Sequence, residues 1–417
     1  MKNTLADFNL FYSIFSYATN FGTRCHYRKI EYRGCENIPE GEHYIIAPCH
    51  QNALMEPMLV LNMLRKPVVF LARADIFKKP VTRFFLNWLR ISPVYRIRDG
   101  RDQLGRNEEI FNNAREVIEK NMPLCLMAEG RHNNRHQLLP LVKGMFRIAG
   151  ATQAELGDKP LYILPVGIDY DDYEQPMSNV VVYVGKPIDV RSFMEAYNAN
   201  QPVALNQMRD ALTVSLKAQM HHVESQEHYD EEYAYCHLKT QDTLHELKLT
   251  NTAWGRFQAR QHISQQMSQL TDEERAQRYA EGAAFAQKCR KKRVPMWFAA
   301  KKWTSTQTGW TLVGVLALVM LISWLDVWKY WFLSNFMVYL PTHIIPKFKI
   351  KDPQFRSSVN YGIRLVTQML NVIVSTIVIW CVEGFWMGLL TAVLGIVSAW
   401  LVPRIFARLR DVWYSLK

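Results

Sequence analysis

Residues 47–57 (APCHQNALMEP) hold the side chains best suited to chemistry. An apolar run from Tyr44 to Ala47 predicts a short buried strand, and apolar residues at helical spacing follow His50. An imidazole with a pKa of about 6.5 can take a proton from a hydroxyl at neutral pH. A carboxylate such as Glu56 can fix the tautomer of His50 and stabilise the imidazolium that forms. On this stretch alone, a histidine that caps a helix is an equally good interpretation.

Cys49 stands beside His50 and is a second candidate nucleophile. Adjacent side chains usually point in different directions, which favours His50 as the reactive group. The seven cysteines of the chain are scattered and form no Cys-x-x-Cys pair. This usage indicates a reducing compartment, in which cysteines serve as small apolar side chains.

The elements around His50 follow an α/β pattern. Short apolar runs predict strands at residues 28–32, 43–47, 68–72, 92–95, 124–127, 161–166 and 180–184. Helical apolar spacing predicts helices near residues 53–65, 75–90, 102–120 and 143–155. We therefore expect an α/β fold with a mostly parallel sheet covered by helices.

Charged side chains follow three of the predicted strands. His50 comes after one strand, Arg96 after a second and Glu129 after a third. Ligands bind at the carboxyl ends of the strands in such sheets, so we expect these groups to form one site. The guanidinium of Arg96 is suited to grip a phosphate in two-point geometry. Solvated surface arginine is the alternative interpretation.

The segment after Glu129 extends this predicted site. Gly130 permits a tight turn or the close approach of a ligand to the backbone. Arg131, His132 and Lys143 bring hydrogen-bond donors and positive charge to the same neighbourhood. These residues favour an anionic ligand.

The polar stretch from about residue 198 to residue 287 predicts a helical extension to which we assign no chemistry. One cluster in it contains side chains of the types that bind metals: His221, His222, Glu224, Glu227 and His228. Its polar surroundings are typical of a solvated helix face, so we expect no metal there.

The formal charge of +12 favours a polyanionic partner. The sequence contains no zinc-finger spacing, recognition-helix signature or aromatic RNA-binding motif, so we expect membrane lipid as the partner and no nucleic acid. Strongly apolar segments predict two transmembrane hairpins, at residues 311–325, 331–340, 365–382 and 385–402. Basic residues flank both hairpins, which predicts that the rest of the chain lies on the cytoplasmic face. Buried helices of a soluble domain are the alternative.

The ordered motifs resemble the four blocks of the glycerolipid acyltransferases, which acylate glycerol 3-phosphate or lysophosphatidate. The segments that carry the resemblance are His50 to Glu56, Pro93 to Arg96, Ala128 to Arg131 and Leu164 to Val166. Their order and spacing, over roughly residues 40–170, are more specific than any single block.

Two departures from the usual blocks are similar to a branch that includes fungal glycerol-3-phosphate acyltransferases. The first block has Glu56 after five intervening residues, where Asp after four is usual. The third block lacks the usual proline and has Arg131 and His132 where Thr and Arg are common. We still expect the longer Glu56 side chain to reach His50.

The resemblance implies a membrane O-acyltransferase of phospholipid synthesis that requires no cofactor and no metal. His50, oriented by Glu56, would deprotonate the acceptor hydroxyl, which attacks the thioester of acyl-CoA or acyl carrier protein. Lysophosphatidate is the expected acceptor because a membrane enzyme readily meets a lipid substrate. Glycerol 3-phosphate, another lipid acceptor, and a catalytically silent lipid-binding protein are the alternatives.

The resemblance also assigns substrate-binding residues. Arg96, with Arg131 and Lys143, would bind the phosphate of the acceptor. Glu129 would position the glycerol end, next to the flexible backbone of Gly130.

The predicted organisation therefore has four parts. An interfacial N-terminal helix occupies residues 1–26, and a helix packed onto the catalytic domain is the alternative. The acyltransferase domain occupies residues 27–197. A helical extension with a basic juxtamembrane segment covers residues 198–293. A membrane domain with two helical hairpins covers residues 294–417.

Overall fold

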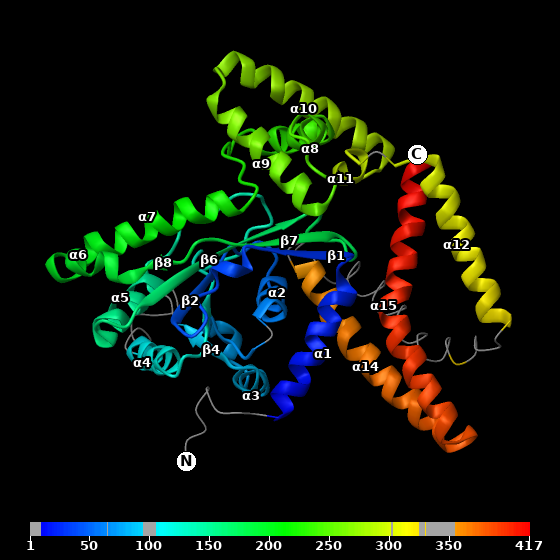
Figure 1. Cartoon of the computed structure of the whole chain (residues 1–417), viewed down its shortest axis with the longest axis horizontal. Helices are drawn as coiled ribbons and strands as arrows, with labels where there is room; N and C mark the ends of the chain where they lie inside the picture. The colour runs from blue at the N-terminus through cyan, green and yellow to red at the C-terminus, as the bar shows by residue number, and fades with distance from the viewer. Residues whose placement is uncertain (1–9, 65, 95–105, 302, 325–329, 331–354) are drawn as a thin grey trace. The chain divides into compact units, whose positions relative to one another are not determined.

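The computed structural model describes residues 10–64, 66–94, 106–301, 303–324, 330 and 355–417 (Figure 1). The chain divides into two compact units. The first unit comprises residues 1–20, 31–169 and 181–222, and the second comprises residues 21–30, 170–180 and 223–417.

A mostly parallel sheet organises the first unit, as expected. Its strands are β1 (Lys29–Arg33), β2 (His43–Pro48), β3 (Val69–Arg73), β4 (Ile91–Val94), β5 (Leu124–Leu126), β6 (Leu161–Tyr170), β7 (Asn179–Val184) and β8 (Ile188–Asp189). Their order in the sheet is β1-β7-β6-β2-β5-β3-β4. The short strand β8 is not part of this order and pairs antiparallel with β6. β2 is parallel to both β5 and β6, and β3 is parallel to both β4 and β5. All seven predicted strands are present, whereas the two-residue β8 is too short to give a sequence pattern.

Four helices lie between these strands, as the apolar spacing predicted. They are α2 (Met55–Leu64), α3 (Pro80–Trp88), α4 (Arg106–Glu119) and α5 (Gly144–Leu156). After the last strand come α6 (Met194–Ala199) and α7 (Gln201–Gln219), and short 3-10 turns lie at Cys35–Asn37, Ala74–Phe77 and Val190–Phe193. The predicted helix at 75–90 is thus a 3-10 turn followed by α3.

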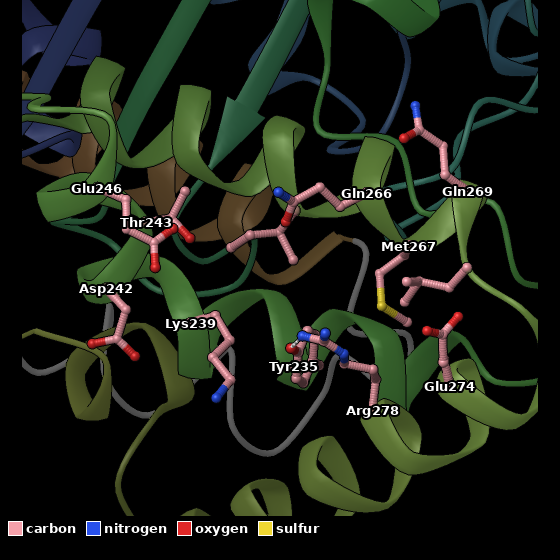
Figure 2. Close-up of a pocket in the computed structure, with 12 residues that line it drawn as sticks. Tyr235, Lys239, Asp242, Thr243, Glu246, Gln266, Met267, Gln269, Glu274 and Arg278 are labelled. Atoms are coloured by element: carbon pink, nitrogen blue, oxygen red, sulfur yellow. Dashed lines mark hydrogen bonds between the residues drawn. The ribbon is translucent and has the colours of Figure 1, made fainter.

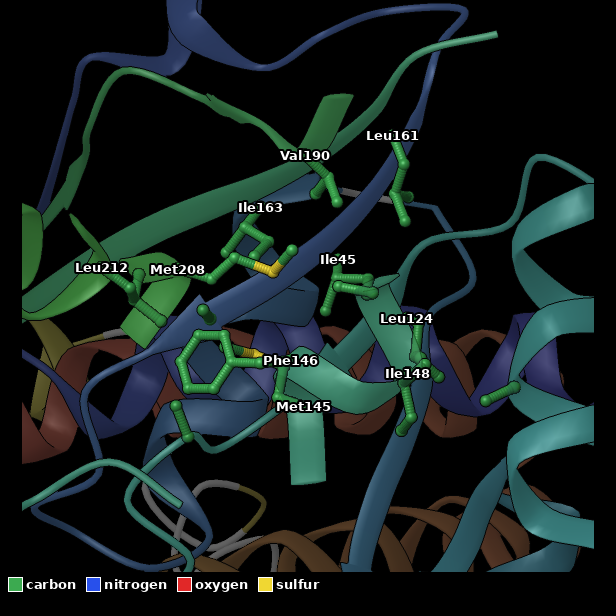
Figure 3. Packing of buried hydrophobic residues seen from close by; sticks show 14 of the residues in the cluster. Ile45, Leu124, Met145, Phe146, Ile148, Leu161, Ile163, Val190, Met208 and Leu212 are labelled. Carbon is green, nitrogen blue, oxygen red and sulfur yellow. The ribbon is translucent and has the colours of Figure 1, made fainter. Parts of the chain in front are cut away.

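One hydrophobic core covers a face of the sheet (Figure 3). Ile45 of β2 and Ile163 of β6 are fully buried and pack with Phe146 of α5. Side chains alternate between the two faces of a strand, so Tyr44 and Ile46 point to the opposite face. The same core includes side chains of α7, namely Leu205, Met208, Leu212 and Leu216. The first unit therefore continues past residue 198, where we predicted a domain boundary.

The second unit is helical in most of its described residues. Its helices are α8 (Tyr229–Glu246), α9 (Ala253–Gln269), α10 (Asp272–Lys292), α11 (Met296–Ala299), α12 (Ser305–Trp324), α14 (Arg356–Glu383) and α15 (Phe385–Ser415). Thr271 and Glu274 form a capping box that starts α10. The buried Asp171 accepts hydrogen bonds from Arg256 (2.9 Å) and Arg260 (3.5 Å) of α9.

Among the described residues, two helices are long and apolar enough to cross a membrane, α14 and α15. Only Gly384 separates them, and its φ of +94° suits a residue without a Cβ. The short turn expected between these two segments is present, and their insertion in a membrane stays a prediction. α12 covers most of the first predicted apolar segment, and the segment 331–340 lies outside the described residues.

The predicted N-terminal helix is α1 (Leu10–His26). Its last turns belong to the second unit, where His26 Nε2 lies 3.0 Å from the Ser357 hydroxyl of α14. Thr23 donates a hydrogen bond to the Tyr361 hydroxyl of the same helix (3.4 Å). The end of α1 thus packs on an apolar helix, and its location at a membrane interface stays a prediction.

Gly167 of β6 generates a stability prediction. A Cβ at this position would lie 1.8 Å from the carbonyl oxygen of Gln219, at the end of α7. Backbone atoms cannot rotate aside, so we expect Gly167→Ala to lower the free energy of unfolding by about 1–3 kcal/mol. Thermal unfolding of the detergent-solubilised protein measures the loss as a lower midpoint. Gly144→Ala is the control, since no atom lies within 4 Å of its Cβ. Equal midpoints for Gly167→Ala and wild type would contradict the packing described.

Candidate active site

The turn between β2 and α2 places His50. β2 ends at Pro48, and α2 begins at Met55, whose N–H donates to the Asn52 carbonyl (2.9 Å). Ala53 in this turn has a φ of +47°, a left-handed conformation that costs a residue with a Cβ about 1–2 kcal/mol. The backbone is therefore strained beside the predicted base, as is common at functional sites.

His50 and Glu56 form the predicted pair. His50 Nδ1 lies 3.2 Å from Glu56 Oε2. Glu56 is fully buried in the first turn of α2, and the His50 side chain is 15% exposed. A carboxylate can only accept, so Nδ1 carries the proton in this contact and Nε2 holds the lone pair. The expectation that Glu56 reaches His50 across the wider spacing is confirmed.

A second bond fixes the Glu56 carboxylate. The Gln51 N–H donates to Glu56 Oε1 (3.3 Å), so both oxygens face the turn that carries His50. The first turn of a helix also favours a negative charge. Glu56 is thus held in place against the Nδ1 side of the His50 imidazole.

Glu129 connects the His50 turn to the loop after β5. Its Oε1 accepts a hydrogen bond from the His50 N–H (2.7 Å), and its Oε2 accepts one from the Leu139 N–H (2.9 Å). Gly130 follows with a φ of +65°, and its N–H donates to the Met127 carbonyl, which makes the predicted tight turn. Both Glu129 oxygens therefore brace the backbone, and the predicted contact with a glycerol end stays a prediction.

Burial raises the pKa of Glu129 to about 8. The hydrogen bonds from Leu139 and His50 oppose this shift, since they favour the charged form. The charge of Glu56 raises the pKa further, and the charge of Arg131 lowers it. Two carboxyl groups thus share one enclosed site.

The residues predicted to bind phosphate make no direct contact with His50 in the described part of the chain. Arg131 is exposed, and its charge acts on Glu129. Lys143 is exposed at the N-cap of α5, and in the described part of the chain no contact joins it to His50. Arg96 lies outside the described residues.

His132 is a neighbour of His50 to which the sequence assigned only donor capacity and charge. Its ring meets the His50 ring edge-on, with 5.5 Å between the ring centroids. The next residue, Asn133, donates its N–H to the His50 carbonyl (3.0 Å). The third block therefore contacts His50 through both backbone and ring, which a linear pattern cannot show.

The alternative nucleophile, Cys49, is fully buried. Its Sγ accepts a hydrogen bond from the Ile168 N–H (3.1 Å). Burial raises the pKa of the thiol well above its ordinary value, and the charges of Glu129 and Glu56 raise it further. A neutral, enclosed thiol is a poor nucleophile, which favours His50 as the reactive group.

A separate pocket of about 580 Å³ lies in the second unit among α8, α9 and α10 (Figure 2). Three of its charged side chains have partners close by. Arg278 donates to the Tyr235 hydroxyl, Glu274 accepts from Thr271 and Lys239 pairs with Glu281.

The interpretation of residues 221–228 as a solvated helix face is wrong. α7 ends at Gln219, the backbone of Met220 is extended, and α8 begins only at Tyr229. His221 is fully buried, whereas Glu224, Glu227 and His228 are exposed. The polar sequence around His221 gives no sign of this burial, because the neighbouring side chains, such as His136, come from distant segments.

The raised pKa of Glu129 predicts a pH dependence of stability. The folded state holds this proton up to pH about 8, whereas the ordinary pKa is 4.5. The stabilisation is therefore complete below pH 4.5 and is lost as the pH rises to about 8. Glu129→Gln cannot titrate, so the unfolding midpoint of wild type should fall relative to that of the variant across this range. Parallel midpoint–pH curves for the two proteins would contradict the raised pKa.

Comparisons with known proteins bear on this site. No curated protein matches the sequence. Among solved structures, the chain is similar to the 1-acyl-sn-glycerophosphate (LPA) acyltransferase PlsC from Thermotoga maritima, with 20% identity and a TM-score of 0.32. That likeness covers 46% of this chain and 75% of the other.

A family comparison covers the segment that holds the His50 turn, Glu56 and Glu129. Residues 29–169 match the family described as Acyltransferase. The part of the chain that holds the candidate site is therefore similar to an acyltransferase domain.

Proposed function

We propose that this protein transfers an acyl chain from acyl-CoA or acyl carrier protein to the hydroxyl of lysophosphatidate in phospholipid synthesis. The 3.2 Å contact between His50 Nδ1 and the buried Glu56 carboxylate carries the proposal. That contact leaves Nε2 of His50 as a base. The family match of the same segment supports acyl transfer as the reaction.

The proposed reaction needs no covalent enzyme intermediate. His50 Nε2 takes the proton of the acceptor hydroxyl as its oxygen attacks the thioester carbonyl. The tetrahedral intermediate then collapses, the C–S bond breaks, and the imidazolium returns its proton to the leaving thiolate. Glu56 stabilises the imidazolium between these two steps.

Positive charge near the site supports a phosphorylated acceptor. We propose that Arg96, Arg131 and Lys143 bind its phosphate, since guanidinium and ammonium groups pair well with phosphate oxygens. Glu129 acts on the acceptor indirectly in this proposal, because both its oxygens accept backbone hydrogen bonds.

We also propose that the hairpin of α14 and α15 anchors the protein in a membrane. Both helices combine sufficient length with high hydropathy, and many of their large apolar side chains are exposed, including Val366, Leu370, Ile373 and Trp386. The flanking basic residues favour a cytoplasmic acyltransferase domain. A lipid acceptor is then available at the same surface.

Glycerol 3-phosphate is the second candidate acceptor. The five residues between His50 and Glu56 favour it, because this spacing is similar to that of the fungal-type branch. Parallel assays with the two acceptors separate the candidates.

Loss of the base should abolish transfer. We expect His50→Ala to lower kcat by about 10²- to 10⁴-fold, the usual contribution of general base catalysis. Purified protein is offered labelled acyl-CoA or acyl carrier protein with each acceptor in turn. His245→Ala is the control, since this exposed histidine lies on α8 of the second unit. Turnover near the wild-type rate in His50→Ala would contradict the proposed mechanism.

The pairing of Glu56 with His50 can be tested separately. The side-chain amide of Glu56→Gln can donate a hydrogen bond to Nδ1, which favours the tautomer with Nε2 protonated. We expect kcat to fall by about 10²-fold or more while the acceptor KM changes little. Glu56→Asp should also lose activity, because its shorter side chain cannot span the contact. Wild-type kcat in both variants would show that Glu56 does not orient the base.

A further inference from the structure

Three buried side chains from separate segments meet beside the site. His136 lies in the loop between β5 and α5, Asp169 lies near the end of β6, and His221 lies two residues after α7. Their exposed fractions are 1%, 2% and 0%. His136 Nδ1 lies 3.1 Å from Asp169 Oδ1, and the rings of His136 and His221 are 5.1 Å apart at their centroids.

The spacing of these groups suits a metal ion. One ligand atom from each residue lies within 4.8 Å of the other two. Bonds from zinc to nitrogen or oxygen are about 2.0–2.2 Å long, so the ligand atoms of a tetrahedral site lie about 3.4 Å from one another. Small rotations of the side chains therefore close this set around a single ion.

The chemistry of the set is equally suitable. Two imidazoles and one carboxylate are ligands that zinc and other first-row divalent ions accept. A buried carboxylate is costly unless its charge is compensated, and a divalent cation supplies that compensation. The competing arrangement is an Asp169–His136 ion pair that needs no metal.

We propose that His136, Asp169 and His221 bind a divalent first-row transition ion, with zinc as its representative. This departs from our expectation that the chain holds no metal. Three protein ligands leave one coordination position for water. The site is a structural clamp, since the proposed acyl transfer needs no Lewis acid.

The contacts next to the three ligands show what the clamp would hold. The Leu138 N–H donates to Nδ1 of His222 (3.1 Å), beside His221. The following Leu139 N–H donates to Glu129, which in turn accepts from the His50 N–H. An ion on His136 therefore fixes the loop that carries Arg131 and His132 against the His50 turn.

The test uses the full chain, purified in detergent without a histidine tag. The protein is stripped with a chelator, and zinc or cobalt(II) is then added. Elemental analysis gives the stoichiometry, and the visible spectrum of bound cobalt reports its ligands. Thermal unfolding measures how much the bound ion stabilises the fold. We expect one ion per chain, a cobalt spectrum typical of nitrogen and oxygen ligands, and a higher unfolding midpoint with zinc.

Conservative variants locate the ion. His136→Gln, Asp169→Asn and His221→Asn should each weaken zinc binding by at least about 100-fold and remove the zinc-dependent rise in the midpoint. His228→Asn is the matched control, since this histidine is exposed near the same segment. It should bind zinc as wild type does.

Three results would overturn the proposal. One is wild-type protein that takes up no stoichiometric zinc or cobalt, whether or not the variants fold. Another is zinc binding of wild-type strength in all three ligand variants. The third is a cobalt spectrum dominated by thiolate ligands, which would place the ion at cysteines. None of these measurements depends on acyl transfer.

Discussion

β2 lies between β5 and β6 and pairs in parallel with both. Parallel strands deliver their carboxyl ends to one edge of a sheet, so the segments that leave these three strands must meet there. The turn after β2 carries His50, the turn after β5 carries Glu129, and the end of β6 carries Asp169. The positions of the proposed base His50, of Glu129 beside it and of the proposed metal ligand Asp169 all depend on this pairing.

The buried carboxyl groups at this edge show how the protein handles enclosed charge. Glu56 is fully buried and contacts one imidazole and one backbone N–H. Glu129 accepts two backbone N–H groups, yet burial keeps its pKa high. Buried carboxylates that are bonded in this way resist movement, because loss of either partner leaves an unsatisfied polar group. The result is an imidazole held rigidly while its outer nitrogen can accept a proton.

The second unit also contains a buried carboxylate with a polar partner, on one of its apolar helices. Asp411 of α15 is fully buried and pairs with Arg28 at 2.6 Å. Arg404 of the same helix donates to the backbone carbonyls of Arg24 and Tyr27. Polar bonds of this kind tie residues 21–30, which lie early in the chain, to the hairpin at its end.

The sequence by itself determined the local elements and pointed to His50 as the proposed base. Apolar periodicity depends on neighbours a few residues apart, so seven strands and the α14–α15 hairpin were predictable. Spacing also identified His50 and Glu56, since six residues bring a strand end to the first turn of the next helix. Only the tertiary structure decided which distant groups meet. Burial of His221, the bracing role of Glu129, the contact of His132 with His50 and the inclusion of α7 in the core all arise from strand order. Strand order is set by packing between residues far apart in the chain, and such packing produces no repeating pattern in the sequence.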